Sequence, residues 1–192
     1  HWVEAQSAYT RGLLDARPGR DAARKRLSRL LSIGTLTAPT PRGSRYFYTK
    51  REGEQNQPIL YVRDSLKGKD RVLVDPNTLS PDGTAAIDWW YPSEDGSLLA
   101  YGVSTSGDEK STLRVLNVST GKPLTDVIPH TRYCSLGWLA DKSGFYYTRY
   151  PAPGEVPAGQ ENYNRHVFFH KLGGDWTKDP KIFGEQRKPE EI

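Results

Sequence analysis

The sequence predicts a mainly β protein, namely a partial β-propeller of about three four-stranded antiparallel blades preceded by a helical segment. Two observations predict this fold. From residue 34 onward, aromatic and β-branched residues form about ten to twelve short runs between clusters of Gly, Pro, Asp and Asn, as in short strands joined by turns. A weak internal repeat of about 50 residues then groups these runs in fours, which is the pattern of propeller blades.

Residues 1–33 are expected to form helix with one interruption. Apolar residues recur at three-to-four spacing on both sides of Pro18-Gly19, as in Leu27, Leu30 and Leu31. This segment carries seven basic and three acidic residues, which is the whole +4 surplus of the chain. Because the positive charge is confined to one end and forms no stripe across the fold, it favours a solvated helix face over a nucleic-acid site.

Three glycines mark the repeat in the remainder of the chain. Gly43, Gly96 and Gly144 lie 53 and 48 residues apart, and each is expected to occupy the turn between a first strand and the three strands that follow it. The strand ahead of the turn is expected over residues 87–91 in the second unit and over residues 133–139 in the third. The expected blades cover residues 34–80, 81–128 and 129–192.

Three blades are too few to close a propeller, for which about four to eight are usual, and an open set leaves sheet edges unpaired. The chain is therefore expected to be truncated at both ends, and its first residues, His1 to Glu4, contain neither an initiator Met nor a signal-peptide core. No apolar run approaches the roughly 18 residues that a membrane span needs. The expected compartment is the cytoplasm, with the periplasm as the alternative.

The chain lacks the short motifs of common catalytic sites. None of its 18 glycines begins a G-x-S-x-G nucleophile elbow, and neither a phosphate-binding loop nor a dinucleotide-binding fingerprint is present. His166 and His170 share one face of an expected strand, but no third metal ligand is near in sequence, which favours a structural role. The only cysteine, Cys134, is expected to pack as a small hydrophobe. No catalytic residue, metal or cofactor is predicted.

The aromatic run Trp89-Trp90-Tyr91 lies in the strand expected ahead of the second turn. Alternate residues of a strand face opposite sides, so packing between neighbouring blades accounts for most of this run. A platform that stacks carbohydrate rings or bases is the alternative, although the run lacks the interleaved basic residues of a nucleic-acid site. The acidic pair Asp108-Glu109 is typical of a solvated turn, which in a propeller faces the mouth or the far rim.

Several stretches resemble, in collinear order, the first blades of the prolyl oligopeptidases, especially their bacterial members. Residues 3–6 resemble the N-terminal helix of that family, which belongs to the hydrolase domain although it precedes the propeller. The blade stretches are Gln55-Asn56-Gln57 with Leu60 to Leu66, Asp75-Pro76-Asn77 with Leu79 to Thr84, Ser93 to Gly96 with Ala100-Tyr101-Gly102 and Ser104, and Gly144 to Tyr147.

The resemblance implies a two-domain serine endopeptidase. In that family a seven-bladed propeller is inserted between a short N-terminal piece and a C-terminal α/β-hydrolase domain with a Ser, Asp and His triad. Residues 1–33 would then belong to the hydrolase domain, residues 34–192 would be an incomplete propeller, and the triad would lie beyond Ile192. The implied substrates are short peptides, cleaved on the carboxyl side of proline, and the propeller would admit them while excluding folded proteins.

Two substrate-binding residues follow from the resemblance. The family places an aromatic residue from the first strand of the third blade in the substrate pocket, and Tyr133 occupies the matching position, where its hydroxyl adds a polar tip. The family also places an acidic residue after the second strand of the second blade, where it pairs with an arginine of the hydrolase domain. Glu109 matches this residue best, and Asp108 is its rival.

Three alternatives stay open. The first is an oligopeptidase B-type peptidase, which cleaves after Arg or Lys. The second is a non-catalytic propeller that binds a protein or peptide at its rim, and the third is nucleic-acid binding through the basic N-terminal helix. Under the main hypothesis no nucleic acid or membrane is a partner, and basic residues such as Arg24 and Arg26 would contact the hydrolase domain.

Overall fold

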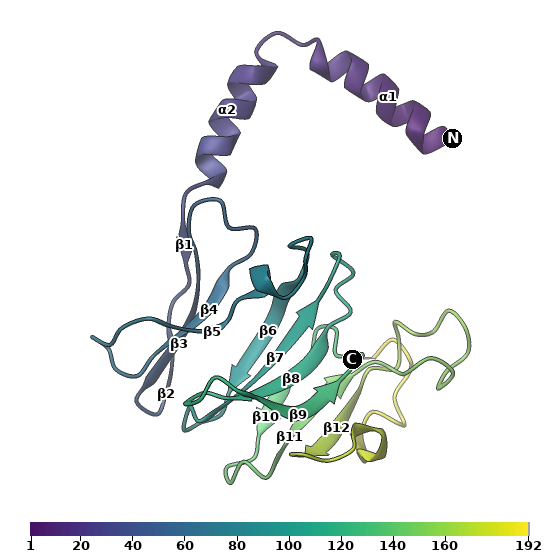
Figure 1. Ribbon diagram of the computed structural model, residues 1–192. Coiled ribbons are helices and arrows are strands. Elements are labelled where there is room, and N and C mark those ends of the chain that lie inside the picture. The colour runs from purple at the N-terminus through teal and green to yellow at the C-terminus, as the bar shows by residue number, and fades with distance from the viewer. Residues whose placement is uncertain (192) are drawn as a thin grey trace.

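The computed structural model describes residues 1–191 as two helices followed by three antiparallel sheets (Figure 1). The helices are α1 (Trp2–Asp15) and α2 (Arg20–Leu31). The first sheet contains β1 (Thr35–Leu36), β2 (Thr40–Arg42), β3 (Arg45–Arg51), β4 (Ile59–Arg63) and β5 (Arg71–Val74). The second contains β6 (Ala86–Pro92), β7 (Leu98–Ser104), β8 (Thr112–Asn117) and β9 (Pro123–Ile128). The third contains β10 (Leu136–Trp138), β11 (Gly144–Arg149), β12 (His166–Lys171) and β13 (Lys181–Phe183).

The predicted fold class is confirmed. Strands follow one another in chain order across the second and third sheets, as in propeller blades, while β1 and β2 both pair with β3 at the start of the first sheet. Short 3₁₀ helices at Pro76–Thr78 and Trp176–Lys178 lie in the connections after β5 and after β12. Among residues 1–191, no helix is long and apolar enough to cross a membrane.

The core consists of two layers, one on each side of the second sheet. Leu99 and Tyr101 of β7 pack with the first sheet, whereas Ala100 between them packs with Phe145 and Tyr147 of the third. Because successive side chains of a strand point to opposite faces, a strand covered on both faces is buried almost throughout, as β7 is. Full burial of a side chain such as Leu99 contributes roughly 1.5–3 kcal/mol, so these two layers hold the three sheets together.

The predicted role of the aromatic run in packing between blades is confirmed. Trp90 packs on the core layer shared with the first sheet, and Trp89 packs on the layer shared with the third. Gly102 makes room for Trp89, because a Cβ at that position would lie 2.3 Å from the indole ring. The indole Nε1 then donates to the carbonyl oxygen of Thr131 at 3.0 Å, which joins the second sheet to the segment that leads into the third.

The prediction that Gly144 occupies the third turn is wrong. Gly144 is the first residue of β11, where a Cβ would lie 2.3 Å from the carbonyl oxygen of His170. The left-handed turn position belongs to Lys142, with φ 60°, and it corresponds to Gly96, with φ 68°. A lysine can take this conformation because Asp141 stabilises the turn: its Oδ1 accepts hydrogen bonds from the backbone N–H and the hydroxyl of Ser143.

The two helices extend away from the sheets (Figure 1). None of the residues described in α1 and α2 is buried, and the apolar stripes of both helices are exposed. Arg51 of β3 connects to this segment, since its guanidinium donates to the carbonyl oxygens of Leu31 at 2.7 Å and Ile33 at 3.3 Å. The helical segment expected over residues 1–33 is therefore present, interrupted near Pro18-Gly19 as predicted.

Candidate functional site

Three connections meet at one end of the second and third sheets. They are the loop between β7 and β8, the link from β9 to β10, and the long loop between β11 and β12. Antiparallel strands alternate in direction, so the loop after the second strand of a blade and the link to the next blade emerge at the same end. We call this end the loop face, and the opposite end the turn face.

On the loop face, both predicted substrate-binding residues meet. The Tyr133 hydroxyl donates a hydrogen bond to Oε2 of Glu109 at 2.7 Å. Arg132 donates to the same carboxylate oxygen at 2.6 Å and to the Tyr133 hydroxyl oxygen at 3.1 Å. The Arg132 guanidinium also lies 4.6 Å from the centre of the Tyr133 ring, a cation–π contact. We call these three residues the Glu109 triad; the sequence predicted two of them and missed Arg132.

The backbone of this site is in an unusual conformation. Glu109, His130 and Tyr133 have φ values of 56°, 62° and 50°, in the left-handed region that non-glycine residues rarely adopt. Each such residue costs on the order of 1 kcal/mol or more and persists where surrounding contacts impose it. Strained residues of this kind concentrate at functional sites.

Hydrogen bonds between the loops impose that conformation. Thr131 is fully buried, and both its backbone N–H and its hydroxyl donate to the carbonyl oxygen of Ser111, at 3.0 and 2.9 Å. The backbone N–H of Tyr150 donates to the carbonyl oxygen of His130 at 2.9 Å. The Glu109 triad is thus held by contacts between the second and third sheets, in addition to its own polar contacts.

The electrostatics of the triad favour an ionised carboxylate. The hydrogen bonds from Tyr133 and then from Arg132 lower the pKa of Glu109, and the bond to Glu109 raises the pKa of Arg132. The rival acidic residue, Asp108, accepts a hydrogen bond from the backbone N–H of Lys110 at 2.9 Å. Of the two acidic candidates, only Glu109 contacts Tyr133 among the contacts described for residues 1–191.

A cavity of about 320 Å³ lies beside the triad. Arg132 belongs both to the triad and to the lining of this cavity, and the loop between β11 and β12 supplies most of the other lining residues. That loop is anchored at its start by Arg149, which is buried, pairs with Glu155 at 3.1 Å and stacks 4.1 Å from the Phe168 ring centre. The cavity is lined by Lys110, His130, Arg132, Tyr150, Pro151, Pro153, Glu161 and Asn162.

A model of the prolyl oligopeptidase N-terminal β-propeller domain matches residues 1–192. The chain belongs to the prolyl oligopeptidase family. A prolyl endopeptidase of Elizabethkingia meningoseptica is 31% identical over 190 residues, which cover 98% of this chain and 26% of the relative. Prolyl oligopeptidase A of Amanita bisporigera is 27% identical over 98% of this chain and 28% of its own length. The family resemblance stated from the sequence is thereby confirmed.

Solved structures of prolyl oligopeptidases have the same fold. One from a mechanistic study of two prolyl endopeptidases superposes with a TM-score of 0.89 at 30% identity, over 96% of this chain and 28% of that one. Prolyl oligopeptidase B of Galerina marginata, bound to a 35-residue hydrolysis and macrocyclization substrate, gives a TM-score of 0.85 at 25% identity, over 98% and 29%. The chain thus spans between a quarter and a third of these proteins.

In this prolyl oligopeptidase propeller, Tyr133 lies outside the strand in which it was expected. The first strand of the third sheet, β10, begins at Leu136, so the strand predicted over residues 133–139 is shorter at both ends. Tyr133 instead lies in the preceding turn, where its left-handed backbone projects the side chain outward with 57% of its surface exposed. Its role in substrate binding stays a prediction.

His166 and His170 lie on one face of β12, but they have different surroundings. His170 is fully buried between Asp126 and Asp179, so both ring nitrogens are engaged by carboxylates, at 3.0 and 2.9 Å. These partners were missed because they lie on other elements. The structural role predicted for His170 fits this geometry.

Cys134 packs in the core layer between the second and third sheets, which confirms its predicted role as a small hydrophobe. Burial raises the pKa of its thiol to about 12, so the sulfur is protonated and unreactive at neutral pH.

Proposed function

We propose that this chain is the N-terminal portion of a serine endopeptidase that hydrolyses short peptides on the carboxyl side of proline. The family match over residues 1–192 carries this proposal, supported by relatives named prolyl endopeptidases of which the chain covers about a quarter. The catalytic Ser, Asp and His would lie C-terminal to Ile192, in an α/β-hydrolase domain of the same parent chain. That domain would be a partner of the propeller. The cytoplasm remains the expected compartment.

In this proposal the propeller controls access, and the Glu109 triad forms part of the substrate pocket. The Tyr133 hydroxyl donates to Glu109 and accepts from Arg132, so its polar tip is already satisfied. Arg132 covers one face of the ring. The other face is therefore left as an apolar surface for a peptide side chain or a proline ring, as in a pocket lined by phenylalanine.

Glu109 would serve as the link to the hydrolase domain. Both hydrogen bonds to its side chain within residues 1–191 are accepted by Oε2, which leaves Oε1 for a further donor. Half of the Glu109 side-chain surface is exposed, so a guanidinium from another domain can reach it. A carboxylate that bonds Tyr133 and that guanidinium together would couple the substrate pocket to the position of the hydrolase domain.

The helical segment would pack on the hydrolase domain. Its exposed apolar side chains include Trp2 and Leu31, with 75% and 67% of their surfaces accessible. Exposed stripes of this kind are typical of surfaces that contact another domain. Arg24 and Arg26 on α2 would then contribute polar contacts at the edge of that interface.

The test is a cleavage assay on the full product of the gene. Two fluorogenic peptides differ only in the residue before the dye, so that one ends in Gly-Pro and the other in Gly-Arg. The enzyme is expected to cleave the Gly-Pro peptide, and a serine-directed phosphonylating reagent should abolish this cleavage. Preference for arginine would assign the protein to the oligopeptidase B type. Absence of cleavage, together with retained peptide binding, would assign it to the non-catalytic propellers.

A further inference from the structure

Asp88 occupies a β-bulge near the end of β6 that adjoins the loop face. Its neighbours Ile87 and Trp89 each pair with a residue of β7, but Asp88 between them has no partner in this register. A bulge redirects side chains, and bulges are frequent next to functional sites. In a regular strand, consecutive side chains point to opposite faces. Here the side chains of Asp88 and Trp89 instead reach two residues that bond each other, Ser111 and Thr131.

The carboxylate of Asp88 accepts one hydrogen bond with each oxygen. Its Oδ1 accepts from the hydroxyl of Ser104 at 3.0 Å, and its Oδ2 accepts from the hydroxyl of Ser111 at 2.5 Å. Both serines are buried, whereas Asp88 is exposed. Because buried hydroxyl groups need hydrogen-bond partners, a surface carboxylate here fixes two residues of the interior. A substitution at Asp88 therefore removes these bonds without opening a cavity in the core.

Ser111 connects Asp88 to both loops that carry the Glu109 triad. The backbone N–H of Ser111 donates to the carbonyl oxygen of Glu109 at 2.9 Å. The carbonyl oxygen of Ser111 accepts the two hydrogen bonds of Thr131 already described, and Thr131 precedes Tyr133 by two residues. Ser111 is thus one hydrogen bond away from the backbone of Glu109 and one hydrogen bond away from the segment that carries Tyr133.

The two loops depend on this anchor because their backbones are strained. Glu109 and Tyr133 both have left-handed φ values. Such conformations persist only where surrounding contacts impose them, and the hydrogen bonds of Ser111 are among those contacts. When the Ser111 hydroxyl loses its acceptor, both loops gain freedom to relax. The Glu109 carboxylate would then shift relative to the Tyr133 ring.

We propose that Asp88 is a positioning residue for substrate binding, and that it holds Glu109 and Tyr133 in their binding arrangement through the hydroxyl of Ser111. Among the hydrogen bonds and ion pairs described for residues 1–191, none joins Asp88 to either of those two side chains. Its effect on them therefore passes through Ser111. The consequence for peptide cleavage rests on the proposed function, whereas the coupling of Asp88 to the two loops does not.

The test is a double-mutant cycle on Asp88 and Ser111 in the full gene product. Asp88→Ala and Ser111→Ala should each raise KM for the Gly-Pro peptide about fivefold at nearly unchanged kcat, because they disturb groups that bind the substrate. The double variant should be no worse than either single variant, since both changes break the same bond. Asp88→Asn should keep KM near the wild-type value, because an amide can accept from one hydroxyl and donate to the other.

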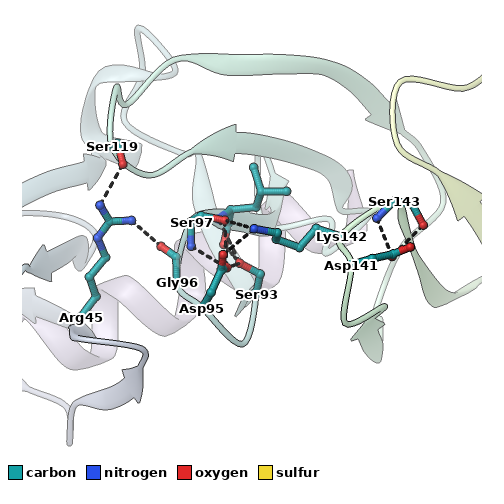
Figure 2. A network of polar contacts seen from close by, with 10 residues as sticks. Arg45, Ser93, Asp95, Gly96, Ser97, Ser119, Asp141, Lys142 and Ser143 are labelled. Carbon is teal, nitrogen blue, oxygen red and sulfur yellow. Dashed lines mark hydrogen bonds and ion pairs between the residues drawn. The ribbon is translucent and has the colours of Figure 1, made fainter.

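Two matched variants serve as controls. Ser104→Ala removes the other hydrogen bond of the same carboxylate and should leave KM within about twofold. Lys142→Ala removes an ion pair between the second and third sheets on the turn face, where Nζ lies 2.5 Å from Oδ2 of Asp95 (Figure 2). It tests whether loosening these two sheets is sufficient, and it should leave KM unchanged.

Residue-resolved hydrogen exchange, measured by mass spectrometry, gives a readout that does not require cleavage. The backbone N–H groups of Ser111 and Thr131 donate within the proposed anchor, so Asp88→Ala should speed their exchange about tenfold or more. The N–H of Lys142, which is hydrogen-bonded within the third turn, should exchange at the wild-type rate.

Three results would overturn the proposal. They are additive effects of Asp88→Ala and Ser111→Ala on KM, a rise in KM for Lys142→Ala as large as that for Asp88→Ala, and unchanged exchange at Ser111 and Thr131 in Asp88→Ala. A wild type that cleaves neither peptide would contradict the proposed function alone. Hydrogen exchange would then decide whether Asp88 holds the two loops.

Discussion

Raising the pH is expected to weaken the contact between the second and third sheets through His170. The imidazole is fully buried, with Nε2 at 3.0 Å from Asp126 of β9 and Nδ1 at 2.9 Å from Asp179, which precedes β13. Both nitrogens face carboxylates, so both must donate, which only the protonated ring can do. Desolvation lowers the pKa of His170, but the hydrogen bonds to Asp126 and Asp179 outweigh it and raise the pKa to about 9.

The size of this effect follows from the difference between the folded and the unfolded pKa of His170. Raising the histidine pKa from 6.5 to about 9 corresponds to about 3 kcal/mol of stability that depends on the proton. Because the folded pKa lies above the unfolded one, this contribution is complete below pH 6.5 and is lost as the pH rises through about 9. Between these limits the free energy of unfolding should fall steadily.

Two measurements check this. Imidazole ¹⁵N NMR should show a doubly protonated His170 at pH 7.5, while His130, whose pKa is lowered mainly by burial, should be neutral there. Urea unfolding followed by tryptophan fluorescence should show that the wild type loses about 3 kcal/mol between pH 6.5 and 9.5 relative to His170→Gln, which lacks the titrating group. An imidazole that titrates near pH 6.5, or parallel pH profiles for the two proteins, would refute the reasoning.

Three further predictions concern the pocket, the core and the helical segment. In the full enzyme, Tyr133→Phe should leave kcat/KM for a Gly-Pro peptide within about threefold, whereas Glu109→Gln should lower it at least tenfold, a loss of about 1.4 kcal/mol; equal effects would contradict the linking role of the carboxylate. Gly102→Ala should lower the free energy of unfolding by about 1–3 kcal/mol, because its Cβ would overlap the Trp89 indole; an unchanged urea midpoint would show that the ring can move. Arg24→Glu should lower the thermal unfolding midpoint of the full enzyme if α2 contacts the hydrolase domain. An unchanged midpoint would show that Arg24 faces solvent and makes no such contact.

The fold was predictable because its signals are local. Strand periodicity and turn chemistry are readable within about ten residues, and their recurrence identified the blades. The third turn is not marked by glycine, so a glycine repeat misplaces it, whereas the repeat of Asp95-x-Ser97 in Asp141-x-Ser143 identifies it. That carboxylate turn lets Lys142 take the left-handed position that elsewhere requires Gly96.

The site residues that the sequence did not predict contact partners that are far away in the chain. Arg132 contacts Glu109, and Asp126 contacts His170, across 23 and 44 residues of sequence. Such pairs depend on how neighbouring sheets stack, which no local pattern specifies. Glu109 and Tyr133 were located through family resemblance, and their direct hydrogen bond became visible only in the structure.

Under the proposed function, the turn face serves stability and the loop face serves substrate recognition. On the turn face, contacts such as Asp95 with Lys142 join short turns of neighbouring blades, so substitutions there should change stability at constant substrate preference. On the loop face, the left-handed residues Glu109 and Tyr133 are held by hydrogen bonds from the second and third sheets. A change in how these two sheets stack would therefore displace the Glu109 triad directly.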